Sequence, residues 1–290
     1  MTQPVPANES GRTAGPSVLI SADMEGVTGV TWTDDVVPGT EQWQRFRTML
    51  TGDVNATVAG ACAGGAGGVL VNEAHLSQRN LLLEDLDTRA RLLTGRHKPL
   101  SMMEGIDSGV DGAVLLGYHA GSGCEGVLSH TYLPAHITGV WLDEAPASEG
   151  RLNTALAAEY GVPILVVTGD DRACADAAEY AREAEHVVVK ECVSRYAAVC
   201  DPPSVTAARI AEAAERSMRR AGRAEPVVSR HRIEIEFDAS HLAQAAAAVP
   251  TVAETGLRRI AFEAETMTEA MKAFKVVTSI ADGAVQGKYG

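Results

Sequence analysis

Carboxylate and imidazole side chains follow three of the short apolar runs in this sequence. They are Asp23 and Glu25 after residues 17–22, His75 after residues 69–71, and His119 after residues 113–116. These side chains are of the kinds that bind zinc, and burying them at a sheet edge costs free energy unless a cation compensates them. The Asp-x-Glu spacing keeps the carboxylates of Asp23 and Glu25 on one side of an extended chain, where they repel each other unless cations lie between them. The residue types and their spacing therefore predict a divalent-metal site.

Each of these residues also has an ordinary structural interpretation. Asp23 could cap a helix, and His75 or His119 could be hydrogen-bonded histidines at strand ends. A coincidence at all three strand ends is much less expected than a shared metal site. His130 lies in a loop after a glycine-rich stretch, and on its own it is weak evidence for a functional role.

The glycine-rich segment 59–68 does not carry a nucleotide-binding signature. It matches neither GxGxxG nor GxxxxGK[ST], so we expect it to close a helix and open the next strand. The sequence also has no GxSxG nucleophile elbow and no HExxH. A zinc site would therefore have to be assembled from distant segments.

The elements that must position these side chains alternate between strand and helix. Strands are expected at residues 17–22, 69–71, 113–116, 164–168 and 187–189, with one or two helices at 41–63 and single helices at 152–160 and 172–184. This alternation is typical of a parallel sheet, in which ligands collect at the carboxyl ends of the strands. The predicted fold class is α/β, with a doubly wound, mostly parallel sheet.

The pattern changes after residue 200. Ser204 is placed to cap an alanine-rich helix that runs to Arg220. Strands are then expected at 232–237 and 259–263, and they alternate with helices at 240–248 and 267–280. The alternation of polar and apolar residues in 232–237 predicts a strand with one solvent-facing side. We therefore expect three parts: a disordered tail at 1–16, an α/β metal-binding catalytic domain at 17–200, and a smaller α+β domain at 201–290.

The composition is that of an ordinary globular protein with an acidic balance. The 290 residues carry a formal charge of −13, which argues against broad binding to nucleic acid or to anionic membranes. The five cysteines form no CxxC pair, and this favours a reduced, cytoplasmic protein. The sequence shows no secretory signal pattern and no apolar stretch long enough to span a membrane.

Several segments, in a fixed order, resemble motifs of the M55 peptidase family of D-aminopeptidases. Residues 21–29 are similar to the family's DMEG motif, residues 69–75 to its VND-x-H strand end, residues 98–105 to its KPxSMxEG segment and residues 115–120 to its LGYHA segment. The similarity continues through residues 128–130, 148–153 and 169–173 and extends from about residue 17 to 282. The resemblance implies the family's fold and a hydrolytic activity.

The resemblance also implies two zinc ions in one site. Asp23 takes the position of the carboxylate that bridges both ions, Glu25 and His75 those of ligands to one zinc, His119 and Glu149 those of ligands to the other, and His130 that of the catalytic histidine. The residues alone do not point to Glu149, which has the pattern of a solvated glutamate in the first turn of a helix. An aminopeptidase must also bind the free α-amine of its substrate, and Asp170 and Asp171 are candidates because they follow a predicted strand.

Our leading hypothesis is a cytoplasmic di-zinc aminopeptidase that removes N-terminal, by resemblance D-, residues from short peptides or amino-acid amides. One alternative is a di-zinc amidohydrolase acting on a lactam or another small amide, since Glu73 stands where the family usually has aspartate and such departures bear on substrate choice. Another is a metal-dependent binding protein without turnover, which the presence of His130 disfavours. The resemblance further implies a homo-oligomer, a decameric ring. We expect no nucleic-acid or membrane partner.

Overall fold

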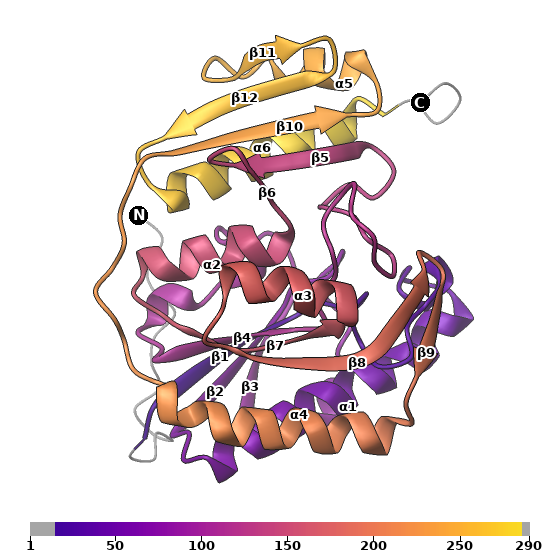
Figure 1. Ribbon diagram of the computed structural model, residues 1–290, viewed down its shortest axis with the longest axis vertical. Coiled ribbons are helices and arrows are strands. Elements are labelled where there is room, and N and C mark those ends of the chain that lie inside the picture. Colours follow the sequence, from indigo (N-terminus) through magenta and orange to yellow (C-terminus); the bar gives the residue numbers. More distant parts are fainter. Residues whose placement is uncertain (1–14, 286–290) are drawn as a thin grey trace.

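A seven-stranded sheet forms the centre of the molecule (Figure 1). The computed structural model describes residues 15–285, so all of the expected tail except Gly15 and Pro16 lies outside the described residues. The strand order is β3-β2-β1-β4-β7-β8-β9, and every neighbouring pair is parallel except the antiparallel β8–β9. The strands are β1 Ser17–Ala22, β2 Gly68–Glu73, β3 Ala90–Leu93, β4 Gly112–Leu116, β7 Ile164–Asp170, β8 Glu185–Ser194 and β9 Ala197–Cys200. The predicted doubly wound, mostly parallel sheet is confirmed.

Helices cover both faces of this sheet. On one face lie α1 (Glu41–Ala63) and α4 (Pro203–Ser217), which pack against each other, and on the other lie α2 (Glu149–Glu159) and α3 (Asp171–Tyr180) (Figure 1). Successive residues of β1 point to opposite faces, so Leu19 joins the core on the α2 side while Val18 and Ile20 join the core on the α1 side. This double coverage explains why β1 is buried throughout rather than at alternate residues.

A second, antiparallel sheet packs above the first through helix α6 (Figure 1). Its strands, in the order β11-β12-β10-β5-β6, are β5 Ile137–Leu142, β6 Ala145–Pro146, β10 His231–Phe237, β11 Ala253–Gly256 and β12 Arg259–Ala264. Helices α5 (Ser240–Ala246) and α6 (Met267–Gly283) cover one side of it, and α6 also contacts α2. The alternating burial of β10 confirms the predicted strand with one wet side.

Both layers of the fold contain elements from before and after residue 200, where the sequence suggested a domain boundary. β5 and β6 precede that residue and pair within the second sheet, whereas α4 follows it and packs on α1 of the first. β5 was not anticipated, because Thr138 and Gly139 interrupt its apolar pattern. The segment between α4 and β10 then crosses from one layer to the other (Figure 1).

Short 3₁₀ turns lie between the main elements, and helix α4 starts at a different residue from the one predicted. Five 3₁₀ turns are η1 Thr33–Asp35, η2 Leu83–Asp85, η3 Ser101–Met103, η4 Ile106–Ser108 and η5 Met218–Arg220. The prediction that Ser204 caps α4 is wrong. The helix begins one residue earlier, at Pro203, with no side-chain cap, because a proline ring is already set for the first helical position.

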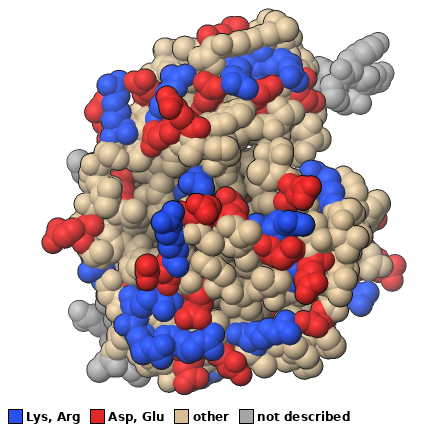
Figure 2. Space-filling view, in the orientation of Figure 1, with Lys and Arg blue, Asp and Glu red and all other residues tan. Residues whose placement is uncertain are grey.

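The outer surface mixes both signs of charge. On the face shown in Figure 2, Lys and Arg side chains form a row over α4, with acidic side chains around it. Arg216 of α4, for example, lies 3.0 Å from the carboxylate of Glu185. Within residues 15–285, none of the helices combines the length and the apolar character needed to cross a membrane.

Candidate metal centre

The candidate ligands lie where the direction of strand addition reverses in the central sheet. β1 pairs with β2 on one side and with β4 on the other, which makes the carboxyl end of β1 the switch point where ligands bind in open α/β sheets. Asp23 and Glu25 follow β1, His75 follows β2, and His119 follows β4. The fold therefore brings the three predicted strand ends to one place.

The loops after β1 and β4 interlock through two glycines. The Gly26 amide donates to the Gly117 carbonyl at 2.7 Å, and a Cβ on Gly26 would lie 2.0 Å from the carbonyl oxygen of Tyr118. Gly117 has φ +71, and a Cβ there would lie 2.3 Å from the carbonyl oxygen of Asp23. Only glycine permits this approach, so the two loops hold Asp23 and His119 in a fixed relation.

A buried lysine on β8 holds the loop after β1 through hydrogen bonds to its backbone. The Lys190 ammonium donates to the carbonyls of Glu25 at 2.6 Å, Val27 at 2.9 Å and Val30 at 2.7 Å. Its three protons thus all go to the backbone of the segment that carries Glu25. Burial lowers the pKa of Lys190 to about 8.

Two groups of ligand atoms share Asp23. His75 Nδ1 lies 3.4 Å from Asp23 Oδ1 and 3.0 Å from Glu25 Oε2, while His119 Nε2 lies 3.3 Å from Asp23 Oδ2 and 3.7 Å from Glu149 Oε2. In each group of three, the ligand atoms lie within 4.8 Å of one another. All five side chains are buried. The arrangement could hold two metal ions with one carboxylate between them.

Backbone carbonyls orient both histidines of these groups. His75 Nε2 donates to the Val36 carbonyl at 2.8 Å, and His119 Nδ1 donates to the Ala120 carbonyl at 3.0 Å. In the neutral tautomers that these hydrogen bonds favour, His75 Nδ1 and His119 Nε2 carry the lone pairs and face the carboxylates. Such outer contacts are how proteins commonly fix the tautomer of a metal-binding histidine.

Several polar atoms of the ligand cluster have no hydrogen-bond partner, and no Lys or Arg side chain forms an ion pair with its carboxylates among residues 15–285. Asp23 Oδ2, Glu25 Oε2 and His119 Nε2 are buried without a hydrogen-bond partner among the described residues. Burial disfavours the charged forms of Glu25 and His75, yet their mutual attraction prevails. It holds the pKa of Glu25 well below its usual value and that of His75 well above. The site thus attracts protons onto its imidazoles, and divalent cations would satisfy the same orphaned atoms.

Glu149 is the ligand that reasoning from the residues alone did not find. It is the first residue of α2, whose cap is the Ser148 hydroxyl, accepting from the Arg151 amide. Its side chain turns inward and is buried, and its Oε1 accepts from the Tyr132 amide at 2.7 Å. A glutamate at a helix start is ordinarily solvated, so only the family motif around it carried a signal.

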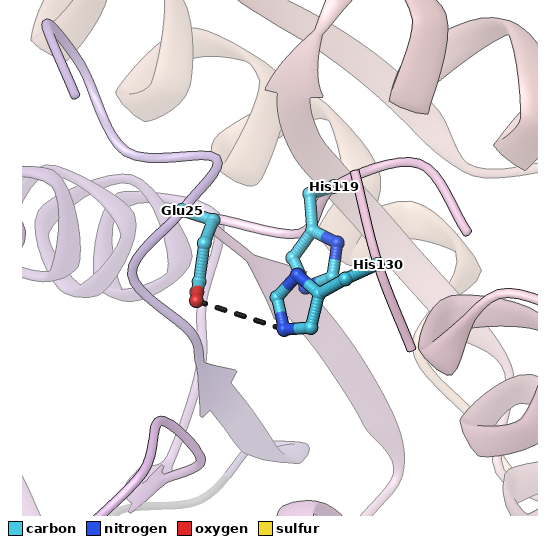
Figure 3. Close-up of side chains that lie close together, drawn as sticks. All are labelled: Glu25, His119 and His130. Atoms are coloured by element: carbon cyan, nitrogen blue, oxygen red, sulfur yellow. Dashed lines mark ion pairs between the residues drawn. The ribbon is translucent and has the colours of Figure 1, made fainter. Parts of the chain in front are cut away.

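His130 stacks on His119 and faces the Glu25 carboxylate (Figure 3). Its Nε2 lies 3.8 Å from Glu25 Oε1 and 3.9 Å from Glu149 Oε1, while Nδ1 donates to the Leu128 carbonyl at 2.8 Å. Leu128 and Tyr132 on either side have φ of 50° and 61°, a left-handed conformation that is costly for residues other than glycine. The loop is therefore held in a strained shape that places His130 at the centre.

Asp170 and Asp171 do not reach this site. Asp170 caps α3 by accepting from the Ala173 amide, and its other oxygen accepts from the Val127 amide at 2.6 Å. Asp171 accepts from the Cys192 amide at 2.6 Å. Both carboxylates thus accept hydrogen bonds from backbone amides, and neither lines the cavity into which the ligand cluster opens.

The ligand cluster opens into a cavity of about 560 Å³, a size typical of small-molecule sites. Asp23, Glu25, His75, His130 and Glu149 form one part of its wall. Further parts of the wall come from the loops after β1, β2, β3 and β4, the β8–β9 hairpin and helix α6 of the second layer. The cavity is therefore enclosed by both layers of the fold.

Comparison with known proteins settles the family. The family model Peptidase_M55, described as D-aminopeptidase, matches residues 17–276. The chain belongs to the M55 peptidase family. The M55 chain is 34% identical over 267 residues to a D-aminopeptidase of Bacillus subtilis strain 168, an alignment covering 91% of this chain and 97% of the relative.

A solved structure of the family has the same fold. It is described as the Zn-dependent D-aminopeptidase DppA from Bacillus subtilis, a self-compartmentalizing protease. It matches with a TM-score of 0.87 and 33% identity, over 92% of this M55 chain and 98% of the solved one. The family resemblance, the α/β fold and the enzyme class inferred from the sequence are thereby confirmed.

Proposed function

We propose that this M55 peptidase is a di-zinc aminopeptidase that releases N-terminal residues, with a preference for D-residues, from short peptides or amino-acid amides. The observation that carries the proposal is the pair of ligand groups that share Asp23 and leave buried polar atoms without partners. The relatives' descriptions as D-aminopeptidases, one of them Zn-dependent, support the metal and the stereochemical preference.

Under this proposal each zinc ion has its own set of ligands. Asp23, Glu25 and His75 would hold one, and Asp23, His119 and Glu149 the other. Two zinc ions supply Lewis acidity toward a carbonyl oxygen and lower the pKa of a water molecule. Asp23 has one carboxylate oxygen toward each group and would therefore help to hold both ions.

His130 is the group free to move a proton. Its Nε2 faces the carboxylates of Glu25 and Glu149. His130 lies outside the two ligand groups built on Asp23, although its side chain could join Glu25 and His119 in a third. Burial and the neighbouring His119 lower the pKa of His130, so its ring is neutral near pH 7. A neutral imidazole can accept a proton and then return it to a leaving amine, which suits peptide-bond hydrolysis.

Two measurements test the proposal together. Metal analysis of the gently purified protein is expected to find close to two zinc equivalents per chain. A panel of D- and L-aminoacyl amides, dipeptides and lactams is expected to show cleavage of free-amine D-substrates first. Protein without zinc, or zinc-loaded protein that leaves every substrate intact, contradicts the proposal. Hydrolysis of lactams alone favours the amidohydrolase alternative.

The proposal extends to assembly and location. Self-compartmentalization of the solved relative supports a homo-oligomer, a decameric ring by resemblance, and light scattering on the eluted protein measures its mass. The five cysteines are all free, which supports a reducing compartment such as the cytoplasm.

A further inference from the structure

Most of the charged side chains that line the cavity, other than the candidate metal ligands, are basic. Apart from the ligand carboxylates, the charged residues on its described wall are Arg96, Lys98, Arg195, Lys275 and Asp282. Four of these five are cations, in a chain whose formal charge is −13. This local excess of positive charge contrasts with the negative net charge of the whole chain.

Arg96 and Lys275 come from different layers and meet at this wall. Lys275 projects from α6, and its ammonium donates to the Lys98 carbonyl at 2.5 Å. Arg96 lies two residues before that carbonyl and lines the same wall, and its like charge opposes that of Lys275. Glu104 acts on Lys275 in the opposite sense, but among residues 15–285 neither cation forms an ion pair with a carboxylate.

The segment that carries Arg96 is tied to the metal centre. The buried Lys98 ammonium donates to the Glu73 carbonyl and to Asn72 Oδ1, each at 2.5 Å, at the end of β2. Glu73 stands two residues before His75. The tether therefore fixes the basic wall next to the strand end that delivers a candidate ligand.

We propose that Arg96 and Lys275 bind the C-terminal carboxylate of the substrate, so that short peptides with a free C-terminus are preferred over amides. This inference rests on the proposed peptidase function and narrows it. Two cations that line one wall and form no ion pair with a carboxylate among residues 15–285 attract an anion, and a guanidinium matches a carboxylate with two parallel hydrogen bonds. In a dipeptide the carboxylate lies only about one residue, ~3.5 Å of extended chain, beyond the scissile bond.

The test compares two substrates that differ only in terminal charge, D-alanyl-glycine and D-alanyl-glycinamide, with the zinc-loaded full chain. We expect kcat/KM to favour the free acid by roughly 10- to 100-fold, the range of a charged hydrogen bond. The double variant Arg96→Gln/Lys275→Met is expected to lose this preference while its activity on the amide is unchanged. Lys272→Met, an exposed lysine on the same helix that does not line the cavity, is expected to retain the preference.

A binding measurement separates this subsite from the hydrolytic function. Calorimetry is expected to show that N-acetylglycine binds the wild-type protein at least about tenfold more tightly than N-acetylglycinamide, and that the double variant loses the difference. If peptides are not cleaved but this binding difference depends on Arg96 and Lys275, the peptidase proposal fails and the carboxylate subsite stands. Equal kcat/KM for acid and amide in the wild type, or a preference that survives in the double variant, overturns the subsite.

Discussion

The imidazole rings of His119 and His130 lie parallel, with centroids 4.2 Å apart and planes 6° from each other. Both rings donate one nitrogen's proton to a backbone carbonyl and turn the other nitrogen toward carboxylates. Only His119 belongs to a ligand group built on Asp23. The stack therefore places a proton-transfer ring directly against a candidate metal ligand, and burial together with the neighbouring His119 lowers the pKa of His130.

The first prediction concerns this division of roles. His130→Ala is expected to retain the wild-type zinc content and to lower kcat/KM by about 10²–10⁴-fold, the usual contribution of general acid–base catalysis. Zinc analysis and steady-state kinetics on a D-aminoacyl substrate check it. His136→Ala removes a histidine outside the cluster, bonded to Asp238, and should have wild-type rates. Unchanged turnover in His130→Ala would remove the role assigned to that ring.

The second prediction concerns metal stoichiometry. Because Asp23 belongs to both ligand groups, Asp23→Ala is expected to lose both zinc ions on dialysis. His75→Ala and His119→Ala each damage one of the two groups built on Asp23 and should each retain about one zinc per chain. Elemental analysis after dialysis gives the ratios. Equal zinc content in all three variants is the result that contradicts a bridging position for Asp23.

The strand-end ligands could be predicted from the sequence because each follows an apolar run that is visible by itself. Asp23, Glu25, His75 and His119 all carry that signal. Glu149 does not, since its burial depends on the loop around Tyr132 folding over the start of α2. Asp170 and Asp171 also follow a strand, yet both carboxylates hold nearby backbone amides instead of facing the cavity. Position after a strand therefore predicts proximity, but not where a side chain points.

Long-range backbone contacts explain the other features that the sequence did not disclose. Lys190 lies in an apolar run, and its three acceptors are carbonyls some 160 residues away along the chain. No spacing rule connects such partners. β5 was missed for a related reason, because its pairing with β10 depends on a strand nearly 100 residues later rather than on its own apolar pattern.

The third prediction tests Lys190 as a positioning residue. Lys190→Met leaves the carbonyls of Glu25, Val27 and Val30 buried without their donor, and is expected to lower the free energy of unfolding by about 3–5 kcal/mol. Urea denaturation of the chelator-treated protein measures this effect without a contribution from metal. The same variant should also release zinc more readily, since the loop carrying Glu25 loses its support. The exposed Lys272→Met should change stability by less than about 0.5 kcal/mol, and a Lys190→Met curve that overlays it would refute the anchoring role.

The last prediction uses Asp53, a buried carboxyl on α1 that accepts from the amide and hydroxyl of Thr28 at 3.0 and 3.1 Å. Burial raises the pKa of Asp53 from 3.8 to about 6. The folded state then binds the Asp53 proton more tightly than the unfolded state, so this group's contribution to stability is present at low pH and is lost as pH rises through about 6. The amide of Asp53→Asn can accept from the Thr28 amide and donate to the Thr28 hydroxyl, which can itself donate to Thr206, without titrating. Between about pH 4 and pH 8, chelator-treated wild type is therefore expected to lose about 2.5 kcal/mol of unfolding free energy relative to Asp53→Asn. Urea denaturation of both proteins across that range gives the difference directly, and parallel pH profiles would show that Asp53 ionises as freely in the folded chain as in the unfolded one.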